Sequence, residues 1–78
     1  MLSNGLKLFV ADVIDEDTGI QKNWYVVEKT YNLAFEKFMK RAESFFYSFA
    51  YYFEEANNDE MEDFIDRYKN IKVGIYDV

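Results

Sequence analysis

Cysteine and histidine are both absent from this chain of 78 residues. Without cysteine there is no disulfide bond and no thiolate metal site. Without histidine the chain lacks the commonest catalytic base and the commonest metal ligand. No apolar run approaches the roughly 18–20 residues that span a bilayer. We therefore expect a protein that is not an enzyme, that holds no cofactor or metal, and that has no membrane partner.

Basic residues are also scarce, with 9 Lys and Arg against 15 Asp and Glu and a net charge of −6. A surface that binds phosphates needs a basic footprint. The charge therefore argues against direct nucleic-acid binding and favours a basic protein partner, or serves only solubility. Lys7 and Asp12 interrupt the first apolar segment, so we expect no signal peptide, and the lack of cysteine fits a cytoplasmic location.

Aromatic residues are abundant, with 8 Phe, 7 Tyr and 1 Trp. A chain this short buries only about 60–65% of its unfolded surface and is usually marginally stable. Each aromatic ring buries a large area and so compensates for the small size, and self-association would be a second compensation. We expect a single domain over residues 1–78.

The N-terminal part predicts an antiparallel hairpin. Leu6 to Ile14 is apolar on both faces, as in a strand at the centre of its sheet, and Lys22 to Lys29 reads as the return strand. Asp15 to Gly19 between them has the residues of a tight turn. This turn is not an EF-hand loop, because Ile20 and Val26 occupy the positions that require Gly and Glu.

The stretch from Leu33 to Ala56 predicts one long helix capped by Thr30 or Asn32. About 24 residues would make a rod of roughly 36 Å. Its charges oppose the helix dipole, with basic residues in the first half and Glu54 and Glu55 at the end. Its apolar residues recur with helical spacing at Phe35, Phe38, Ala42, Phe45, Phe49, Tyr52 and Ala56.

A second, shorter helix is expected from the N-cap Asp59 through Lys69, with Asn70 as a left-handed stop. Residues 71–76 alternate as a last strand. The predicted fold is α+β, with a three-stranded antiparallel sheet in ββααβ order and the long and short helices packed on one face. The last strand would pair beside the first strand, Leu6 to Ile14, which would then be central.

The sharpest feature is a run of seven acids without an intervening Lys or Arg. On a helix, residues three or four apart lie about 5–6 Å from each other, so these acids would form a rail of negative charge that imitates phosphates. The alternatives are a solvated helix face, or a carboxylate site for Mg²⁺ or Mn²⁺. The seven are Glu54, Glu55, Asp59, Glu60, Glu62, Asp63 and Asp66.

Two tyrosines, Tyr47 and Tyr51, lie off the apolar stripe of the predicted long helix. Tyr is enriched at protein contact sites, so they are either interface anchors or residues packed beneath a loop. Trp24 and Tyr25 could stack nucleic-acid bases on an open sheet, or belong to the core or to an interface. The first option would use a basic strip of Lys7, Lys22, Lys29 and Lys72.

In overall character the chain resembles the small acidic inhibitors that phages and mobile elements make against host defence enzymes, anti-CRISPR proteins among them. The resemblance lies in shortness, acidity, many aromatics, absence of cysteine and a compact α+β plan, and it carries over no functional residue. It implies an inhibitor, which would act in the host cytoplasm if the chain is phage-encoded. The seven acids would make this inhibitor a DNA mimic.

Our hypothesis is a non-enzymatic acidic binding protein that inhibits a nucleic-acid-handling protein by occupying its basic surface. Tyr47, Tyr51 and the seven acids would bind the partner. The alternative is a structural or adaptor module that forms a homodimer through the long aromatic helix.

Overall fold

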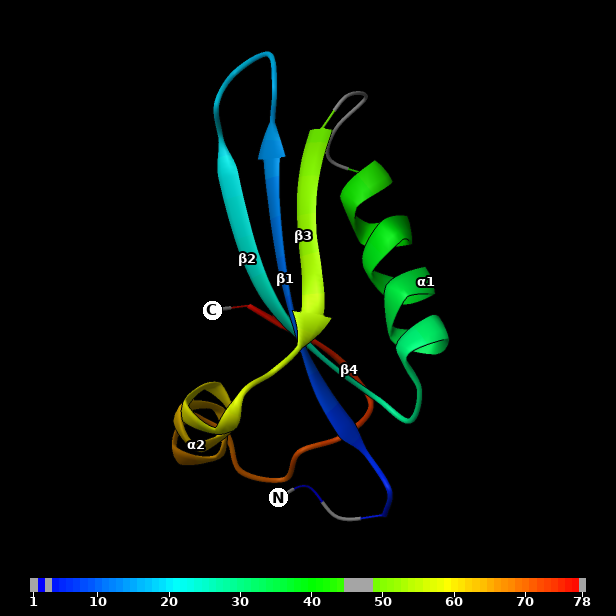
Figure 1. Cartoon of the computed structure of the whole chain (residues 1–78), viewed down its shortest axis with the longest axis vertical. Helices are drawn as coiled ribbons and strands as arrows, with labels where there is room; N and C mark the ends of the chain where they lie inside the picture. Colours follow the sequence, from blue (N-terminus) through cyan, green and yellow to red (C-terminus); the bar gives the residue numbers. More distant parts are fainter. Residues whose placement is uncertain (1, 3, 45–48, 78) are drawn as a thin grey trace.

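A four-stranded antiparallel sheet organises the computed structural model, which describes residues 2, 4–44 and 49–77. The strands lie in the order β3-β1-β2-β4 (Figure 1). The predicted α+β class is confirmed, whereas the prediction of three strands is wrong. In chain order the elements are β1 (Lys7–Asp15), β2 (Gln21–Glu28), α1 (Tyr31–Glu43), β3 (Phe49–Glu55), α2 (Asn58–Arg67) and β4 (Gly74–Asp77).

The β1–β2 hairpin is the part that the sequence predicted best. The two strands pair antiparallel from Lys7 opposite Glu28 to Ile14 opposite Gln21. The backbone N–H of Gly19 donates to the carbonyl oxygen of Asp15 at 2.7 Å. Gly19 has a φ of +75°, a conformation that glycine adopts without steric cost. The acid and glycine residues therefore close the turn as their types indicated.

The predicted helix from Leu33 to Ala56 is confirmed only in its first part, and its length is wrong. A helix, α1, begins after Thr30, whose side chain accepts from the N–H of Leu33 at 3.2 Å, and it ends at Glu43. Residues 49–55 instead form β3, which pairs antiparallel with β1. The aromatic residues in this segment alternate with period two as well as with helical spacing, and aromatic residues fit a pleated surface well. Because this segment pairs with β1, it forms a strand rather than a continuation of the helix.

The end of α1 at Glu43 also explains the positions of the basic residues, which were unfavourable for the dipole of the longer predicted helix. Lys40 and Arg41 lie in the last turn of α1, where the helix dipole favours positive charge. Arg41 Nη2 bonds Asp77 Oδ1 at 2.7 Å, and its guanidinium lies 5.2 Å from the centre of the Trp24 ring. Arg41 therefore connects α1 to both β4 and β2.

The last strand was predicted beside the first, and this is wrong because β4 pairs with β2. The outer edge of β1 is occupied by β3, so the edge of β2 is the one left for β4. The apolar character of β1 on both faces is nevertheless explained by a central position, as predicted. Asn70 adopts the predicted left-handed conformation, with a φ of +56°. It is not the helix stop, because α2 was predicted to run through Lys69 and instead ends at Arg67, with Tyr68 as an extended C-cap.

The two helices cover opposite faces of the sheet, so the prediction that both pack on one face is wrong. Alternate residues of β1 and β2 point to opposite faces, and both sets are apolar, so each face needs a cover. On the α1 side the core contains Phe9, Ala11, Val13, Trp24, Val26, Ala34, Phe38, Ala42 and Phe53. On the α2 side it contains Leu2, Leu8, Tyr25, Val27 and Phe64.

The second helix covers only part of its face. It packs at the end of the sheet far from the hairpin turn (Figure 1), and Phe64 is its only fully buried residue. Nearer the hairpin turn, Ile14 is 42% exposed and Tyr52 is 49% exposed on the same face. The half of this face next to the hairpin turn is therefore open to solvent.

Candidate protein-binding face

A capping box at the start of α2 positions its acidic side chains. The N–H of Glu60 donates to Asn57 Oδ1 at 2.8 Å, and the N–H of Asn57 donates to Glu60 Oε1 at 2.9 Å. The helix was predicted to start from Asp59 as N-cap, and the actual N-cap is Asn57. Asp59 thus falls in the first turn, where the helix dipole favours a negative charge.

Three acids of α2 point away from the sheet. Residues of a helix are spaced about 100° apart around its axis, so Asp59, Glu62 and Asp66 lie on the side opposite the buried Phe64. All three are exposed. Among the residues that the structure describes, none of the three forms an ion pair with a Lys or Arg.

Asp63 lies at the border between α2 and the sheet and is partly neutralised. Its Oδ2 pairs with Arg67 Nε at 3.2 Å and accepts a long hydrogen bond from the Tyr25 hydroxyl at 3.4 Å. Burial, followed by the charge of Asp63, raises the pKa of Tyr25 above its ordinary value. Asp63 therefore contributes to holding α2 on the sheet.

Carboxylates also gather around Tyr52 on the open part of the sheet. The Tyr52 hydroxyl donates to Glu54 Oε2 at 2.8 Å, and Asp12 is the residue opposite Tyr52 on β1. Burial raises the pKa of Asp12, and the negative charge of Glu60 raises it further. The hydrogen bond to Glu54 is the main cause of a raised pKa at Tyr52, to which Glu60 and Asp12 also contribute. Burial and the negative charge of Glu60 contribute to both shifts.

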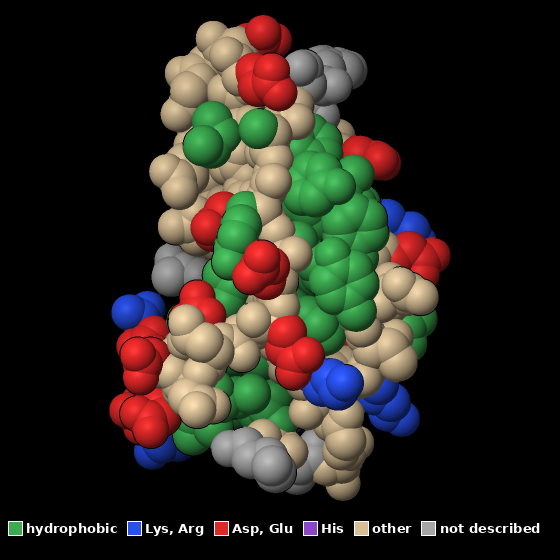
Figure 2. Space-filling view, in the orientation of Figure 1, with side chains coloured by type: hydrophobic (Ala, Val, Ile, Leu, Met, Phe, Trp, Pro, Cys, Tyr) green, Lys and Arg blue, Asp and Glu red, His purple; other side chains and the backbone are tan. Residues whose placement is uncertain are grey.

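We call this surface the acidic face: α2 together with the uncovered part of the sheet beside it. Figure 2 shows acidic side chains over α2 and over the neighbouring sheet in one view. In the sequence Asp12 stands out only as an interruption of an apolar strand, because its neighbours Tyr52 and Glu60 come from distant parts of the chain. The carboxylates of the acidic face are those of Asp12, Glu54, Asp59, Glu60, Glu62, Asp63 and Asp66.

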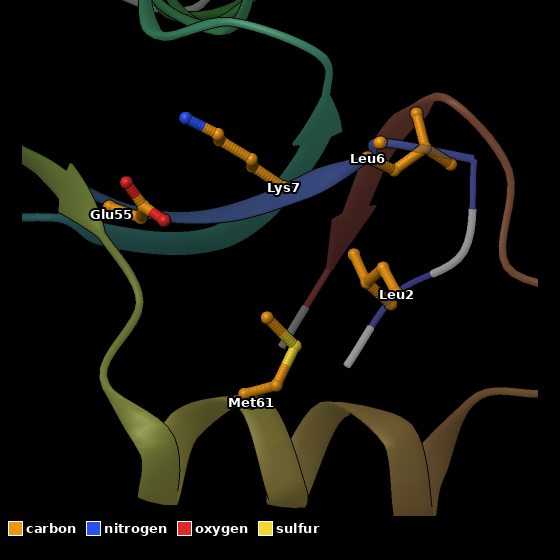
Figure 3. A pocket seen from close by; sticks show the side chains of 6 residues that line it. Leu2, Leu6, Lys7, Glu55 and Met61 are labelled. Atoms are coloured by element: carbon orange, nitrogen blue, oxygen red, sulfur yellow. The ribbon is translucent and has the colours of Figure 1, made fainter.

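Of the seven predicted acids, Glu55 does not belong to the acidic face. Successive residues of a strand point to opposite faces, so Glu55 lies on the α1 side while Glu54 lies on the α2 side. Glu55 instead lines a hollow of about 400 Å³ at the end of the sheet, together with Lys7, Leu6 and Met61 (Figure 3). The predicted rail of seven acids is therefore divided.

The structure places only one of the two tyrosines that were predicted as interface anchors. Tyr47 lies outside the described residues. Tyr51 is 51% exposed, but it lies on β3 rather than on a helix, on the α1 side, where its ring is 5.7 Å from that of Phe35. Tyr52 is the tyrosine that the structure brings to the acidic face.

The base-stacking option for Trp24 and Tyr25 is wrong. Trp24 is 2% exposed and Tyr25 is 6% exposed, so neither ring offers a face to a nucleic-acid base. Within residues 2, 4–44 and 49–77, no three carboxylates converge in a way that could hold a metal ion. Over the same residues, no helix has the length and apolar character needed to cross a membrane.

Comparison of the chain with protein-family models, with curated proteins and with solved structures found no match.

Proposed function

We propose that this protein is a non-enzymatic binding protein whose acidic face occupies a basic surface of another protein, and that the partner handles nucleic acid. The observation that carries the proposal is a row of three acids on the side of α2 that faces away from the sheet, which we call the outer row. Asp59, Glu62 and Asp66 point into solvent without an ion pair to any described Lys or Arg. Carboxylates in this state are available to the cations of a partner.

The charge of this row suits a surface built for phosphates. Acids that recur every three or four residues of a helix advance by about 5 Å along the axis, which is wider than the roughly 3.4 Å between phosphates along the axis of one DNA strand, so the likeness is one of charge rather than of spacing. Arg and Lys form charge-assisted hydrogen bonds with carboxylates as they do with phosphates. Occupation of such a surface by the acidic face would exclude the nucleic acid and so inhibit the partner.

Tyr52 supplies an aromatic contact within the same face. It is half-exposed and lies among Glu54, Glu60 and Asp12, and Tyr is enriched among the residues that dominate binding energy. In this proposal Tyr52 is the anchor on the acidic face, whereas Tyr51 faces the other side of the sheet. The overall resemblance to phage and mobile-element inhibitors supports a host defence enzyme as the first partner class to test.

The test reverses two charges of the outer row in the double variant Glu62→Lys with Asp66→Lys. Proteins captured by wild type from a host lysate at low salt would be identified by mass spectrometry, and the leading candidate purified. We expect the double variant to bind the purified candidate at least tenfold more weakly. Wild-type binding should weaken steeply between roughly 50 and 300 mM salt, because exposed charges are screened.

The matched control is the double variant Glu16→Lys with Asp17→Lys in the hairpin turn. Both positions are exposed acids, so the control changes the net charge by the same amount on another part of the surface. It should bind within about threefold of wild type, since long-range attraction between exposed charges is largely screened at physiological salt. Equal loss in both double variants, or no loss in either, would refute the acidic face as the docking surface.

A further inference from the structure

The outer edge of β3 offers unpaired backbone groups. The N–H of Ala56 donates to the carbonyl oxygen of Leu8 at 2.9 Å, and residues alternate between bonded and non-bonded pairs along an antiparallel ladder. Glu54, Tyr52 and Ala50 therefore also bond β1. The alternate residues Phe49, Tyr51, Phe53 and Glu55 direct their N–H and C=O groups outward, where no described strand pairs with them.

This edge lacks the usual devices that prevent strand pairing. Exposed edge strands are commonly protected by Lys, Pro or a bulge. β3 contains neither Lys nor Pro, and its register with β1 runs without a bulge from Phe49 opposite Asp15 to Glu55 opposite Phe9. Its two charges, Glu54 and Glu55, lie together at one end. The remainder of the edge is suited to pairing with another strand.

An aromatic surface lies directly beside this edge. Tyr31 and Tyr51 are about half-exposed, and both contact Phe35, with ring centres 6.0 and 5.7 Å away. Figure 2 shows a continuous hydrophobic patch over the region between β3 and α1. An apolar patch of this kind marks an interaction surface on a small protein.

We propose that two copies of this chain pair antiparallel through β3 and join their sheets into one. A two-fold axis at Tyr52 places Tyr51 opposite Phe53 of the second copy and Phe49 opposite its Glu55. In this register all seven residues of β3 are paired, and each outward-directed residue faces another outward-directed residue. The strand is therefore complementary to itself in its backbone groups.

The side chains fit a second copy as well. On the α1 side the register places Tyr51 and Phe53 beside Phe53 and Tyr51 of the other copy, and aromatic cross-strand pairs stabilise sheets. Glu54 would lie opposite Ala50, and Glu55 opposite Phe49, so the carboxylates of the two copies lie at opposite ends of the paired strands. A register shifted by one residue would place outward groups opposite inward ones.

This dimer does not depend on the proposed function. The acidic residues of α2 lie on the other face of the sheet from α1 and away from the pairing edge, whereas Tyr52 and Glu54 lie on β3 itself and belong to both surfaces. Charge repulsion between two copies of net charge −6 is screened by salt, so salt should strengthen the dimer. The same change should weaken binding of a basic partner, and the two proposals can therefore fail separately.

The test is a cross-link in a chain without native cysteine. In the proposed register Tyr52 lies opposite itself in a non-hydrogen-bonded pair, with Cα atoms about 4.5 Å apart, which a disulfide can bridge. Under mild oxidation, Tyr52→Cys should form a covalent dimer at least tenfold faster than Ile20→Cys. Ile20 is a matched control, because it is 51% exposed and lies outside the paired strand.

A second pair of variants tests the edge without oxidation. Tyr51→Lys introduces one charge within the pairing strand β3, and Ile20→Lys introduces the same charge in the hairpin turn. Both side chains are 51% exposed in the single copy, so both variants should keep the circular dichroism spectrum of the wild type. Light scattering should show the dimer dissociation constant raised at least tenfold by Tyr51→Lys and little changed by Ile20→Lys.

Two results would overturn the proposal. One is a wild-type chain that stays monomeric by light scattering up to a concentration of about 500 μM, where even a weak dimer with a dissociation constant of that order is well populated. The other is a Tyr52→Cys variant that cross-links no faster than Ile20→Cys.

Discussion

The two faces of this sheet are made by alternate residues of the same strands, but one face is covered by α1 and the other is only partly covered by α2. On the α1 side, Phe38 stacks on Phe53 with ring centres 5.1 Å apart, and β1 contributes Phe9 as a fully covered ring. On the α2 side, Phe64 holds a short helix at one end of the face, and the rest is open. The comparison teaches that a chain this small can complete one core and leave part of its second face exposed to solvent.

The charges follow the same division. On the α1 side, Glu28 is buried and its carboxylate lies 3.5 Å from Lys37 Nζ, while Arg41 bonds Asp77. On the α2 side, the ion pair found among the described residues is Asp63 with Arg67. Charges on the closed side hold elements together, whereas most carboxylates on the acidic face form no ion pair with a Lys or Arg in the part of the chain that the structure describes.

The largest predicted effect comes from removing the central ring of each face. Phe38→Ala should cost about 3–5 kcal/mol, which is a large part of the roughly 4–12 kcal/mol expected for a domain of this size. Hydrogen exchange should then be faster throughout the sheet. Phe64→Ala should instead release α2 first, since Phe64 is the only fully buried residue of that helix and weakly held segments open locally.

Hydrogen exchange followed by NMR measures both variants residue by residue. Each can be compared with wild type under the same conditions, with amides of β1 and β2 as the reference. If Phe64→Ala lowers protection in β1 and β2 as much as in α2, the two faces are not separable and the comparison fails.

A smaller effect is expected from the helix caps. Asn57→Ala removes a side chain that takes part in a reciprocal pair of hydrogen bonds with Glu60 and should cost about 1 kcal/mol. Thr30→Ala removes one longer bond to the N–H of Leu33 from a helix whose buried face is more extensive. Urea denaturation should therefore show a larger fall in stability for Asn57→Ala than for Thr30→Ala. The reverse order would show that α2 is held by packing rather than by its cap.

The smallest predicted effect concerns Asp12 and depends on pH. Its pKa is raised in the folded state, first by burial and then by Glu60, so folding penalises the charged form. Asp12→Asn should raise the melting temperature by about 2–4 °C at pH 7, which corresponds to less than about 1 kcal/mol for a partly solvated group.

The sign of this effect can be checked by changing the pH. Below the ordinary value of 3.8 the carboxyl group is protonated in both folded and unfolded chains, so the advantage of Asp12→Asn should shrink to nothing near pH 3. Differential scanning calorimetry at pH 7, 5 and 3 measures it. A gain that grows as the pH falls would contradict burial and the charge of Glu60 as the causes of the shift.

Local signals in the sequence were sufficient for part of the fold. The Asp15 to Gly19 turn, the Thr30 cap and the left-handed Asn70 each depend on a few adjacent residues, and each was predicted. The error was the region after Glu43, where a dense run of aromatics satisfies a helical and a strand period together. Lys40 and Arg41 were a usable signal, since basic residues mark the last turn of a helix.

The candidate site was predictable to a similar extent. The exposed acids of α2 were found because their helical spacing is a local property. Asp12 and Tyr52 were missed as site residues because strand pairing brings them together across 40 positions of sequence, and that pairing was hidden by the helix predicted in place of β3. The same error hid the fact that Glu54 and Glu55, as neighbours on a strand, point to opposite faces of the sheet.

The single tryptophan of this small protein is an intrinsic fluorescence probe that reports on one region only. Trp24 is 2% exposed and lies against Phe38 and the guanidinium of Arg41. Its fluorescence therefore records whether α1 is docked, whereas far-ultraviolet dichroism averages over every element. If the far-ultraviolet dichroism changes before the Trp24 fluorescence during unfolding, then α2 unfolds before the rest of the protein.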